Sequence, residues 1–307
     1  MNKSSEPKHI ISAAQFSTEH IFNLFKLADD IRANPESYMH SLEGKTVATI
    51  FYEPSTRTRL SFTAAVQNLG GKLLSTENAN ENSSVNKGET IEDTIRVLGR
   101  LSNAIIIRHM EDDSAIRAAK VSNVPIINAG AGKAEHPTQS LLDLYTIHKE
   151  IKRIDNLKSA FVGDLKYGRT HHSLITMLLN LGNKEMHCVS TPSLALPQKY
   201  TDCIASKGAK YFEHYSLDSL PRDVNFIYHS RIQKERLNGD DISKAMFIIN
   251  KEVLDTFSPN TILMHPLPRN AEISFDVDAD PRAVYFKQVE NGMYIRMALL
   301  HSIFHGK

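Results

Sequence analysis

The sequence predicts an α/β protein with two doubly wound parallel-sheet domains. Short, almost continuously apolar runs alternate with longer amphipathic segments, and this alternation occurs in both halves of the chain. Strands that are apolar throughout are typical of parallel sheets covered by helices on both faces. The length of 307 residues also exceeds the usual size of one hydrophobic core, which favours two domains.

The first half shows the alternation from residue 46 onward. The β-branched run Thr46–Phe51 predicts a strand, and the helix that follows is expected from Thr58 to Leu69. Gly70 then ends this helix, as glycine commonly does just past a helix C-terminus. The later elements of this half are expected as a strand at 104–107, a helix at 111–120, a strand at 124–127 and a helix at 136–150.

The second half begins with the apolar run 159–162, which predicts another strand. A loop over 163–170 leads into a helix expected from His171 to Leu181. The remaining elements are expected as strands at 186–190, 225–229 and 261–264 and a C-terminal helix at 294–304. The helix at 136–150 lies between the two sets of strands and is the best candidate for the connection. The expected domains are 1–150 and 151–289, with 290–307 packing back on the first.

The balance of charges excludes some classes of partner. The 36 basic and 35 acidic side chains leave a formal charge of +1, so we expect no nucleic acid and no anionic membrane as a partner. No run approaches the roughly 20 apolar residues that cross a bilayer. The first residues also lack the apolar core of a secretory signal. We therefore expect a cytoplasmic protein.

The cysteines and histidines form no metal-site pattern. Cys188 and Cys203 make no C-x-x-C pair and are too few for a four-cysteine zinc site. Cys188 lies in the apolar stretch 186–189, where a buried and inert thiol is expected. For His171 and His172, surface or capping roles are favoured. We predict no metal site.

The loop after the first strand is the most informative segment. It leads into a helix, where backbone N–H groups lack intrahelical partners and the helix dipole is positive, so a phosphate fits there. Ser55, Thr56 and Thr58 add neutral donors, and Arg57 can give a charge-assisted contact. Alternatively, Ser55 or Thr56 only caps the helix. The string S-T-R-T-R carries more charge than a cap requires, which favours an anion site.

This string at 55–59 resembles the carbamoyl phosphate loop of the aspartate/ornithine carbamoyltransferase family. Five further motifs follow in the family's order, so the resemblance covers essentially the whole chain. It implies transfer of the carbamoyl group of carbamoyl phosphate to the amino group of L-aspartate, early in de novo pyrimidine biosynthesis and without a cofactor. It also implies an active site in the cleft between the domains. The loop residues expected to bind carbamoyl phosphate are Ser55, Thr56, Arg57 and Thr58.

Arg108 and the H-P-T-Q motif at 136–139 are expected to act on the carbonyl group. Alone, an arginine at a strand end is often a solvated charge, and a histidine at a helix start is often a cap. In the family, the arginine matching Arg108 contacts the phosphate and the carbonyl oxygen, and the histidine matching His136 donates to that oxygen. The glutamine matching Gln139 bonds the carbamoyl amino group. Because amine attack makes the oxygen negative, we expect Thr58, Arg108 and His136 to stabilise it.

The acceptor side is expected to bind a dicarboxylate. The loop 163–170 has neither G-x-G-x-x-G nor a P-loop ending, which argues against a nucleotide site. By resemblance, Arg169 binds the α-carboxylate of aspartate, while Arg231 and Gln233 bind the β-carboxylate. In the late motif H-P-L-P-R, family members that use ornithine typically carry cysteine where this chain has Leu267. The carbonyl groups of Leu267 and its neighbour Pro268 are expected to accept from substrate amino groups.

The polar stretch before residue 91 has two interpretations. By composition it is a surface loop that ends in a helix cap. By resemblance it crosses into the neighbouring subunit of a homotrimer, where Ser83 and Lys87 complete the active site. Some bacterial members of the family also bind a regulatory chain, and the sequence leaves this open.

Two positions near the H-P-T-Q motif depart from the family pattern. Ala131 stands where aspartate is common, and Glu135 where an amide is frequent. A carboxylate beside His136 is expected to favour its protonated form. Glu53 is a further candidate, for salt bridges with Arg169 or Arg236. The rival interpretations are a carbamoyltransferase for another amine, a non-catalytic phosphate-binding homologue, and a nicotinamide oxidoreductase.

Overall fold

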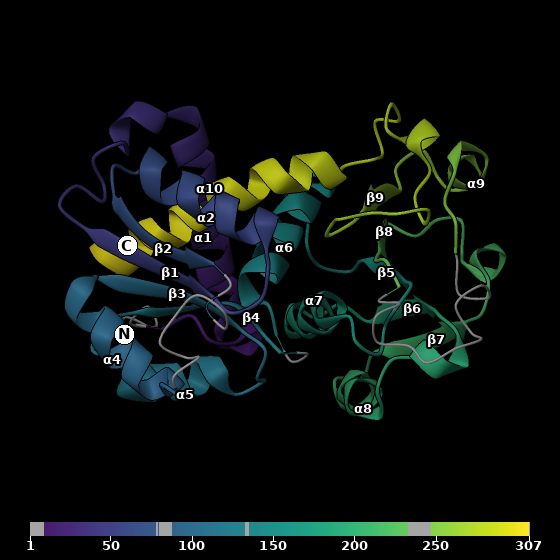
Figure 1. Ribbon diagram of the computed structural model, residues 1–307. Coiled ribbons are helices and arrows are strands. Elements are labelled where there is room, and N and C mark those ends of the chain that lie inside the picture. The colour runs from purple at the N-terminus through teal and green to yellow at the C-terminus, as the bar shows by residue number, and fades with distance from the viewer. Residues whose placement is uncertain (1–8, 78, 80–87, 133–134, 233–246, 307) are drawn as a thin grey trace. The chain divides into compact units, whose positions relative to one another are not determined.

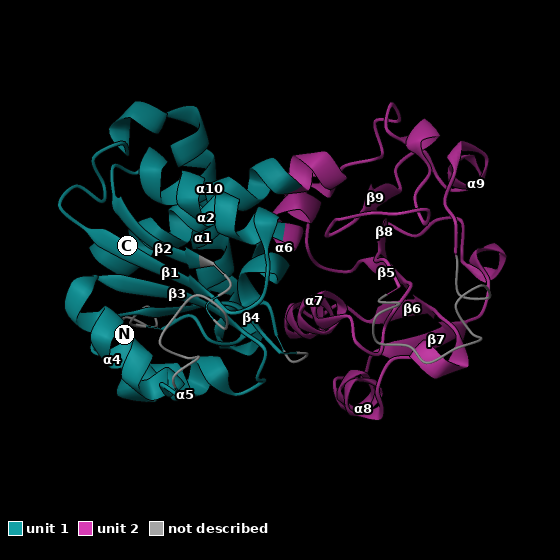
Figure 2. Ribbon diagram, viewed as in Figure 1, with its two compact units in different colours: residues 1–142, 289–307 teal, residues 143–288 magenta. Residues whose placement is uncertain are grey.

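The computed structural model describes residues 9–77, 79, 88–132, 135–232 and 247–306. It divides into two compact units (Figure 2). Unit 1 consists of Met1–Leu142 and Val289–Lys307, and unit 2 of Asp143–Gln288. The chain passes between the units inside two helices, α6 (Pro137–Ile151) and α10 (Tyr285–His305). The first passage thus lies earlier in the sequence than the boundary expected at 150.

Unit 1 is built on a four-stranded sheet in the order β2-β1-β3-β4 (Figure 1). All neighbouring strands run parallel. The bounds of the strands are β1 Thr46–Phe51, β2 Lys72–Glu77, β3 Ala104–His109 and β4 Ile126–Ala131. Because β1 lies between β2 and β3, the chain winds in opposite directions on either side of it. The carboxyl ends of β1 and β3 therefore flank a topological switch point, where α/β sheets bind ligands.

Helices cover both faces of this sheet (Figure 1). On one face, Ala48 and Ile50 of β1 pack against Ile91 and Ile95 of α4. The helix N-terminus is capped by Thr90, whose hydroxyl accepts from the backbone N–H of Asp93 at 3.2 Å. The helices of this unit, besides α6 and α10, are α1 Thr18–Ala33, α2 Thr56–Asn68, α4 Ile91–Leu101 and α5 Ser114–Val121.

Unit 2 contains a five-stranded sheet in the order β7-β6-β5-β8-β9, again parallel throughout. Its switch point lies between β5 and β8. The strands are β5 Lys158–Val162, β6 Glu185–Val189, β7 Lys210–His214, β8 Phe226–His229 and β9 Ile262–Met264. The helices, besides α6 and α10, are α7 Arg169–Asn180, α8 Gln198–Ser206 and α9 Lys251–Asp255.

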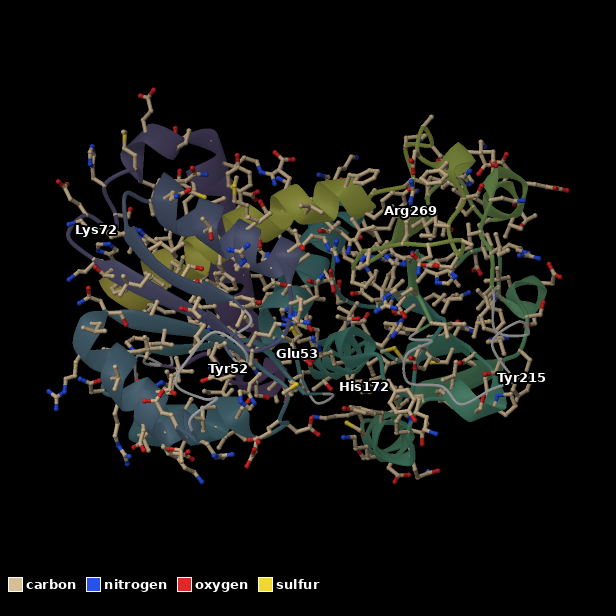
Figure 3. The ribbon with its side chains drawn as sticks, in the orientation of Figure 1. Tyr52, Glu53, Lys72, His172, Tyr215 and Arg269 are labelled. Carbon is tan, nitrogen blue, oxygen red and sulfur yellow. The ribbon has the colours of Figure 1, made fainter. Side chains whose placement is uncertain are left out.

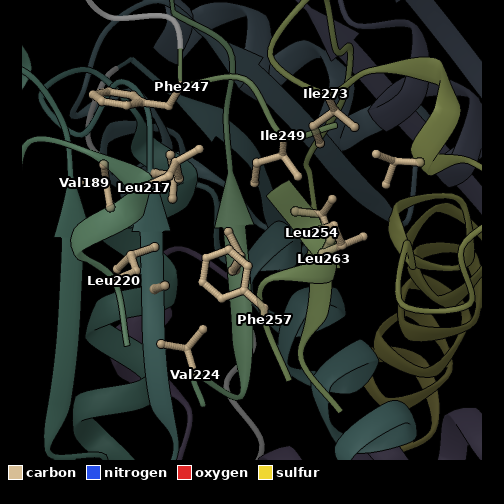
Figure 4. Close-up of a cluster of buried hydrophobic side chains, with 14 of the residues drawn as sticks. Val189, Leu217, Leu220, Val224, Phe247, Ile249, Leu254, Phe257, Leu263 and Ile273 are labelled. Carbon is tan, nitrogen blue, oxygen red and sulfur yellow. The ribbon is translucent and has the colours of Figure 1, made fainter. Parts of the chain in front are cut away.

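A cluster of buried apolar side chains packs on one face of this second sheet (Figure 4). Val162 and Ile227 from the central strands contribute to it, as does Leu263 from β9. Leu254 of α9 and Phe257, just after that helix, pack against the same face. Leu217, Leu220 and Val224 belong to the same cluster, so the connection between β7 and β8 packs against the sheet.

The predicted fold class of two parallel-sheet α/β units is confirmed. The C-terminal helix begins at Tyr285, earlier than the expected Tyr294. Gly292 lies inside the helix, where an added Cβ would come within 2.5 Å of Arg296 Nη1 and 3.0 Å of Leu142 Cδ2. Glycine is therefore present for close packing rather than for termination.

The described residues also bear on the expectations for a membrane span, for Cys188 and for the two histidines of α7. Among them, no helix combines the length and the apolar composition needed to span a bilayer. Cys188 is buried, as predicted, and burial raises the pKa of its thiol. His171 and His172 are also buried, so the surface role favoured for them is wrong. The His171 ring packs against Phe161 and Tyr228, and His172 Nε2 lies 2.7 Å from the carbonyl oxygen of Leu165.

Candidate active site

The loop after β1 leads directly into α2, as predicted for the phosphate loop. The helix begins at Thr56, earlier than the expected Thr58, because the backbone N–H of Arg59 already bonds the carbonyl of Ser55 at 3.1 Å. Ser55 occupies the N-cap position, but its side chain makes no capping hydrogen bond. Thr56 and Arg57 are exposed, whereas Thr58 is buried. The Ser55 side chain therefore does not cap the backbone N–H groups of this helix start, where an anion can bind.

Arg108 faces this loop across the switch point of unit 1. The strand register pairs it with Phe51, and its carbonyl accepts from the backbone N–H of Tyr52 at 2.9 Å. Its Nη1 donates to Ser55 Oγ at 3.2 Å. Its Nε forms an ion pair with Glu53 Oε2 at 3.3 Å. Figure 3 labels Glu53 beyond the end of β1. These contacts with a hydroxyl group and a carboxylate hold the Arg108 guanidinium beside the phosphate loop.

His136 lies beside the buried end of the same loop. Its Nε2 is 3.5 Å from Thr58 Oγ1, and both side chains are buried. The carbonyl of His136 accepts from the backbone N–H of Gln139 at 3.0 Å, which starts α6. Thr58 and His136, which are far apart in the sequence, therefore lie side by side in unit 1.

The segment before His136 is held from two directions. The backbones of Ala131 and Glu135 pair through a 3.1 Å hydrogen bond. Gly132 has φ +48°, and an added Cβ would lie 1.9 Å from Asp112 Oδ1, so only glycine fits. The carboxylate of Glu135 accepts from Ser12 Oγ at 2.8 Å and from the backbone N–H of Ala13 at 2.6 Å. The hydrogen bonds of this carboxylate thus join the N-terminal segment to the loop that carries His136.

In unit 2, the loop after β5 approaches the end of β8 very closely. Gly163 has φ +110°, and an added Cβ would lie 2.3 Å from the carbonyl oxygen of Ser230. Asp164 is buried and its Oδ1 accepts from the backbone N–H of Tyr167 at 2.9 Å, which closes the turn before Arg169. Arg169 is the first residue of α7 and is half-buried.

Arg231 follows β8 on the other side of the same switch point. The preceding residue, Ser230, is fixed by a 3.0 Å hydrogen bond from its backbone N–H to the carbonyl of Val162. The hydroxyl of Ser230 is buried and has no hydrogen-bond partner among the described residues. Arg231 itself is half-buried. Two arginines and one unsatisfied hydroxyl thus flank the switch point, an arrangement that suits carboxylates.

The late motif lies after β9 in the same unit. Leu267 adopts φ +55°, in the left-handed region, and its backbone N–H donates to Nδ1 of His265 at 2.8 Å. Arg269, labelled in Figure 3, forms an ion pair with Asp278, so this cation neutralises a neighbouring carboxylate. Sequence reasoning gave no role to His265, although its position in the motif, two residues before Leu267, was the available signal.

Several predicted residues lie outside the described residues. These are Ser83, Lys87, Gln233 and Arg236. Their predicted roles, and the predicted salt bridge from Glu53 to Arg236, therefore stay predictions. Among the residues that the structure does describe, no group of three or more His, Cys, Asp or Glu side chains could hold a metal ion.

Two family descriptions match consecutive parts of the chain. The carbamoyl-P binding domain of aspartate/ornithine carbamoyltransferase matches residues 8–149. The Asp/Orn binding domain of the same family matches residues 155–303. Together they cover nearly the whole sequence, and the point at which one gives way to the other lies at the end of α6.

Known proteins resemble the chain over its whole length. The aspartate carbamoyltransferase catalytic subunit of Methanocaldococcus jannaschii is 46% identical over 301 residues, which are 96% of this chain and 97% of the relative. The chloroplastic aspartate carbamoyltransferase 3 of Pisum sativum is 44% identical over 97% of this chain and 78% of its own length. Aspartate transcarbamoylase from Trypanosoma cruzi, solved with carbamoyl aspartate and phosphate, matches with a TM-score of 0.92 at 39% identity, covering 97% of this chain and 96% of that one. The chain belongs to the aspartate/ornithine carbamoyltransferase family.

Proposed function

We propose that this chain is an aspartate carbamoyltransferase, which transfers the carbamoyl group of carbamoyl phosphate to the amino group of L-aspartate. The observation that carries the proposal is the meeting of Arg108 with Ser55, and of His136 with Thr58, around the start of α2. The relatives named above are aspartate carbamoyltransferases, and the Trypanosoma cruzi structure contains carbamoyl aspartate and phosphate. Production of carbamoyl aspartate places the reaction early in pyrimidine biosynthesis.

Unit 1 supplies the site for carbamoyl phosphate in this proposal. The phosphate binds at the start of α2, where Ser55, Thr56 and Arg57 donate to its oxygens. Gln139 bonds the carbamoyl amino group. The domain that carries these residues is expected to be 1–150, completed by 290–307.

The reaction requires stabilisation of charge on the carbonyl oxygen. The amino nitrogen of aspartate attacks the carbonyl carbon, a C–N bond forms, and the C–O bond to phosphate breaks. The amine proton leaves with the phosphate. Thr58, Arg108 and His136 donate to the oxygen while it is negative, and removal of one such donor typically costs about 2.7–4 kcal/mol of transition-state stabilisation. No covalent enzyme intermediate is needed, because carbamoyl phosphate is already an activated acyl donor.

Unit 2 supplies the site for aspartate. Arg169 binds the α-carboxylate, and Arg231 with Gln233 binds the β-carboxylate. The carbonyl groups of Leu267 and Pro268 accept from substrate amino groups. An aliphatic ammonium group such as that of ornithine would instead require an acidic partner, so the two arginines and Leu267 favour aspartate.

The remaining parts of the proposal concern assembly and location. The chain is expected to form a homotrimer in which Ser83 and Lys87 of each chain serve the neighbouring active site. A regulatory chain is a further candidate partner. The protein is expected to be cytoplasmic, although the pea relative is chloroplastic.

The acceptor is tested by incubating the purified chain with carbamoyl phosphate and either aspartate or ornithine, with products identified by mass spectrometry. We expect carbamoyl aspartate and no carbamoyl ornithine. Formation of the ornithine product would overturn the roles of Arg169 and Arg231. Binding of phosphate without turnover of either amine would instead favour a non-catalytic homologue, and the departure at Ala131 would be the first position to restore to aspartate.

A further inference from the structure

The loop after β9 contains a leucine in a conformation that leucine rarely adopts. Leu267 has φ +55°, where the Cβ crowds the backbone. Such a residue keeps this conformation only when its surroundings hold it there. The described contacts of its backbone therefore show what fixes the loop.

His265 supplies the contact that holds Leu267. The backbone N–H of Leu267 donates to His265 Nδ1 at 2.8 Å, so this ring nitrogen must be the acceptor. The proton of the neutral ring is then on Nε2, which lies 3.0 Å from Oε1 of Glu272. The same oxygen also accepts from the backbone N–H of Asn270 at 3.0 Å. Carboxylate, imidazole and backbone amide thus form one chain of hydrogen bonds in which each donor has an acceptor.

The charge of Glu272 fixes the tautomer of this histidine. Burial alone would raise the pKa of Glu272, but the hydrogen bonds from His265 and from the backbone of Asn270 outweigh burial and lower it to about 2. An ionised carboxylate can only accept, so Nε2 must donate to it. Nδ1 is left as the acceptor for Leu267. A second imidazole, of His229, lies with its centroid 6.2 Å away and is tilted against the ring.

The backbone of His265 is anchored to the interior of unit 2. Its N–H donates to Gln288 Oε1 at 2.8 Å, and Gln288 Nε2 donates to Asp143 Oδ1 at 2.9 Å. The other oxygen of Asp143 accepts from the Tyr228 hydroxyl at 2.8 Å. All of these side chains are buried. Hydrogen bonds through Gln288 of α10, Asp143 of α6 and Tyr228 of β8 therefore hold the start of this loop in place.

We propose that His265 is a positioning residue that, through Nδ1, fixes Leu267 so that the Leu267 carbonyl orients the amino group of the acceptor. The inference rests on the proposed function, in which that carbonyl accepts from the substrate amine. The carboxylates of aspartate are bound by other residues, so loss of the Nδ1 contact impairs the orientation of the nucleophile more than the binding of the substrate. Misorientation of reacting groups lowers the rate of the chemical step.

Two substitutions of similar size separate Nδ1 from the rest of the ring. In His265→Asn, the amide oxygen can lie where Nδ1 lies and accept from Leu267. In His265→Gln, the longer side chain reaches toward Glu272 and offers Leu267 no acceptor. We expect the asparagine variant to keep kcat within about threefold of the wild type. The glutamine variant should lose at least about tenfold in kcat, with a change of less than about threefold in the KM for aspartate.

The control is His214→Gln, which changes a histidine on the edge strand β7 and is expected to leave both kinetic constants unchanged. Melting temperatures are measured for all variants. Equal loss of kcat in the asparagine and glutamine variants, or loss that only follows the melting temperature, would overturn the role of Nδ1.

A measurement on the wild type keeps the inference testable where a variant does not fold. Nitrogen-15 NMR distinguishes a protonated from an unprotonated ring nitrogen. We expect the resonances of His265 to show an unprotonated Nδ1 and a protonated Nε2, and the Leu267 amide to exchange slowly with solvent. The opposite tautomer would overturn the inference whatever the activity is. Absence of carbamoyl aspartate with the wild type would instead contradict the proposed function, and the tautomer would still report on the contact itself.

Discussion

The guanidinium of Arg108 donates to the hydroxyl of Ser55 across the switch point between β3 and β1, at 3.2 Å. Arg108 lies near the end of β3, and Ser55 is the N-cap residue of α2, the helix that follows β1. Glu53 completes the arrangement, with its Oε2 3.3 Å from Nε of the same arginine. A phosphate that binds at the helix start would therefore lie near the Arg108 guanidinium.

Replacement of Arg108 by alanine should remove a donor to the developing oxyanion. We expect kcat to fall by about 10²–10³, the usual effect of losing one such donor. Steady-state kinetics with carbamoyl phosphate and aspartate would measure this. Arg100→Ala serves as the control, because Arg100 is an exposed arginine near the end of α4. A loss of less than tenfold in the Arg108 variant would argue against its role at the carbonyl oxygen.

Replacement of Gly163 by alanine should destabilise unit 2 and weaken the binding of aspartate. The added Cβ would lie 2.3 Å from the Ser230 carbonyl oxygen, so the ends of β5 and β8 must separate. Gly208→Ala is the matched control, because Gly208 also has positive φ, +65°, but nothing lies within 4 Å. Unfolding in urea should show a loss of about 1–2 kcal/mol for the control, from backbone strain alone. The Gly163 variant should lose clearly more, and equal losses would contradict the close approach.

Replacement of Glu135 by alanine should loosen the segment before His136. The backbone N–H of Ala13 and the hydroxyl of Ser12 would lose their acceptor, at a cost of about 1–3 kcal/mol in the free energy of unfolding. Unfolding in urea measures this loss, and Ser12→Ala should reproduce part of it. A second substitution, Glu135→Gln, tests whether the Glu135 carboxylate favours protonated His136. If that expectation holds, loss of the charge in Glu135→Gln should move the pH dependence of kcat to lower pH.

Acidification should destabilise unit 2 through His171. Burial, helped by the neighbouring His172, lowers the pKa of His171 to about 3. In the unfolded chain its pKa is about 6.5, so between these values the unfolded state binds the proton and the folded state does not. Stability should therefore be full above about pH 6.5 and fall as the pH is lowered, by about 2 kcal/mol at pH 5 for this one group.

Unfolding in urea at pH 7 and pH 5 measures this loss. His171→Phe supplies the comparison, since the ring already packs against Phe161 and Tyr228. The variant should lose less stability than the wild type between the two pH values. An equal loss would assign the acid sensitivity to other groups.

The sequence predicted the central strands well because they are buried on both faces. Thr46–Phe51 was predicted with the bounds that β1 has, since a run of β-branched and apolar residues is the signal of such a strand. The edge strands β2 and β7 were not predicted. Their residues, as in Lys210–His214, are largely exposed and polar, so no apolar run marks them. The opposite edge strands, β4 and β9, are buried and carry apolar runs, and strands were predicted there.

The candidate site was predictable where a motif carries it and not where distant segments meet. The string that contains Ser55 indicates an anion site by its local chemistry alone. The contact between Glu135 and Ser12 joins positions far apart in the chain, and the local sequence at neither position indicates that the two residues meet. Glu53 was predicted to pair with Arg169 or Arg236, and the structure gives it a salt bridge with Arg108. Arg108 is close to Glu53 because β3 pairs with β1, although the two residues are far apart in the sequence.

The most direct test mixes aspartate and the purified chain with carbamoyl phosphate that is labelled with carbon-13 at the carbonyl carbon. Carbon NMR should show the label moving into carbamoyl aspartate with release of phosphate. Transfer should be abolished by Arg57→Ala and retained by Arg100→Ala. Rapid transfer by the Arg57 variant, or no transfer by the wild type, would contradict the assignment of the β1–α2 loop as the site that binds and activates carbamoyl phosphate.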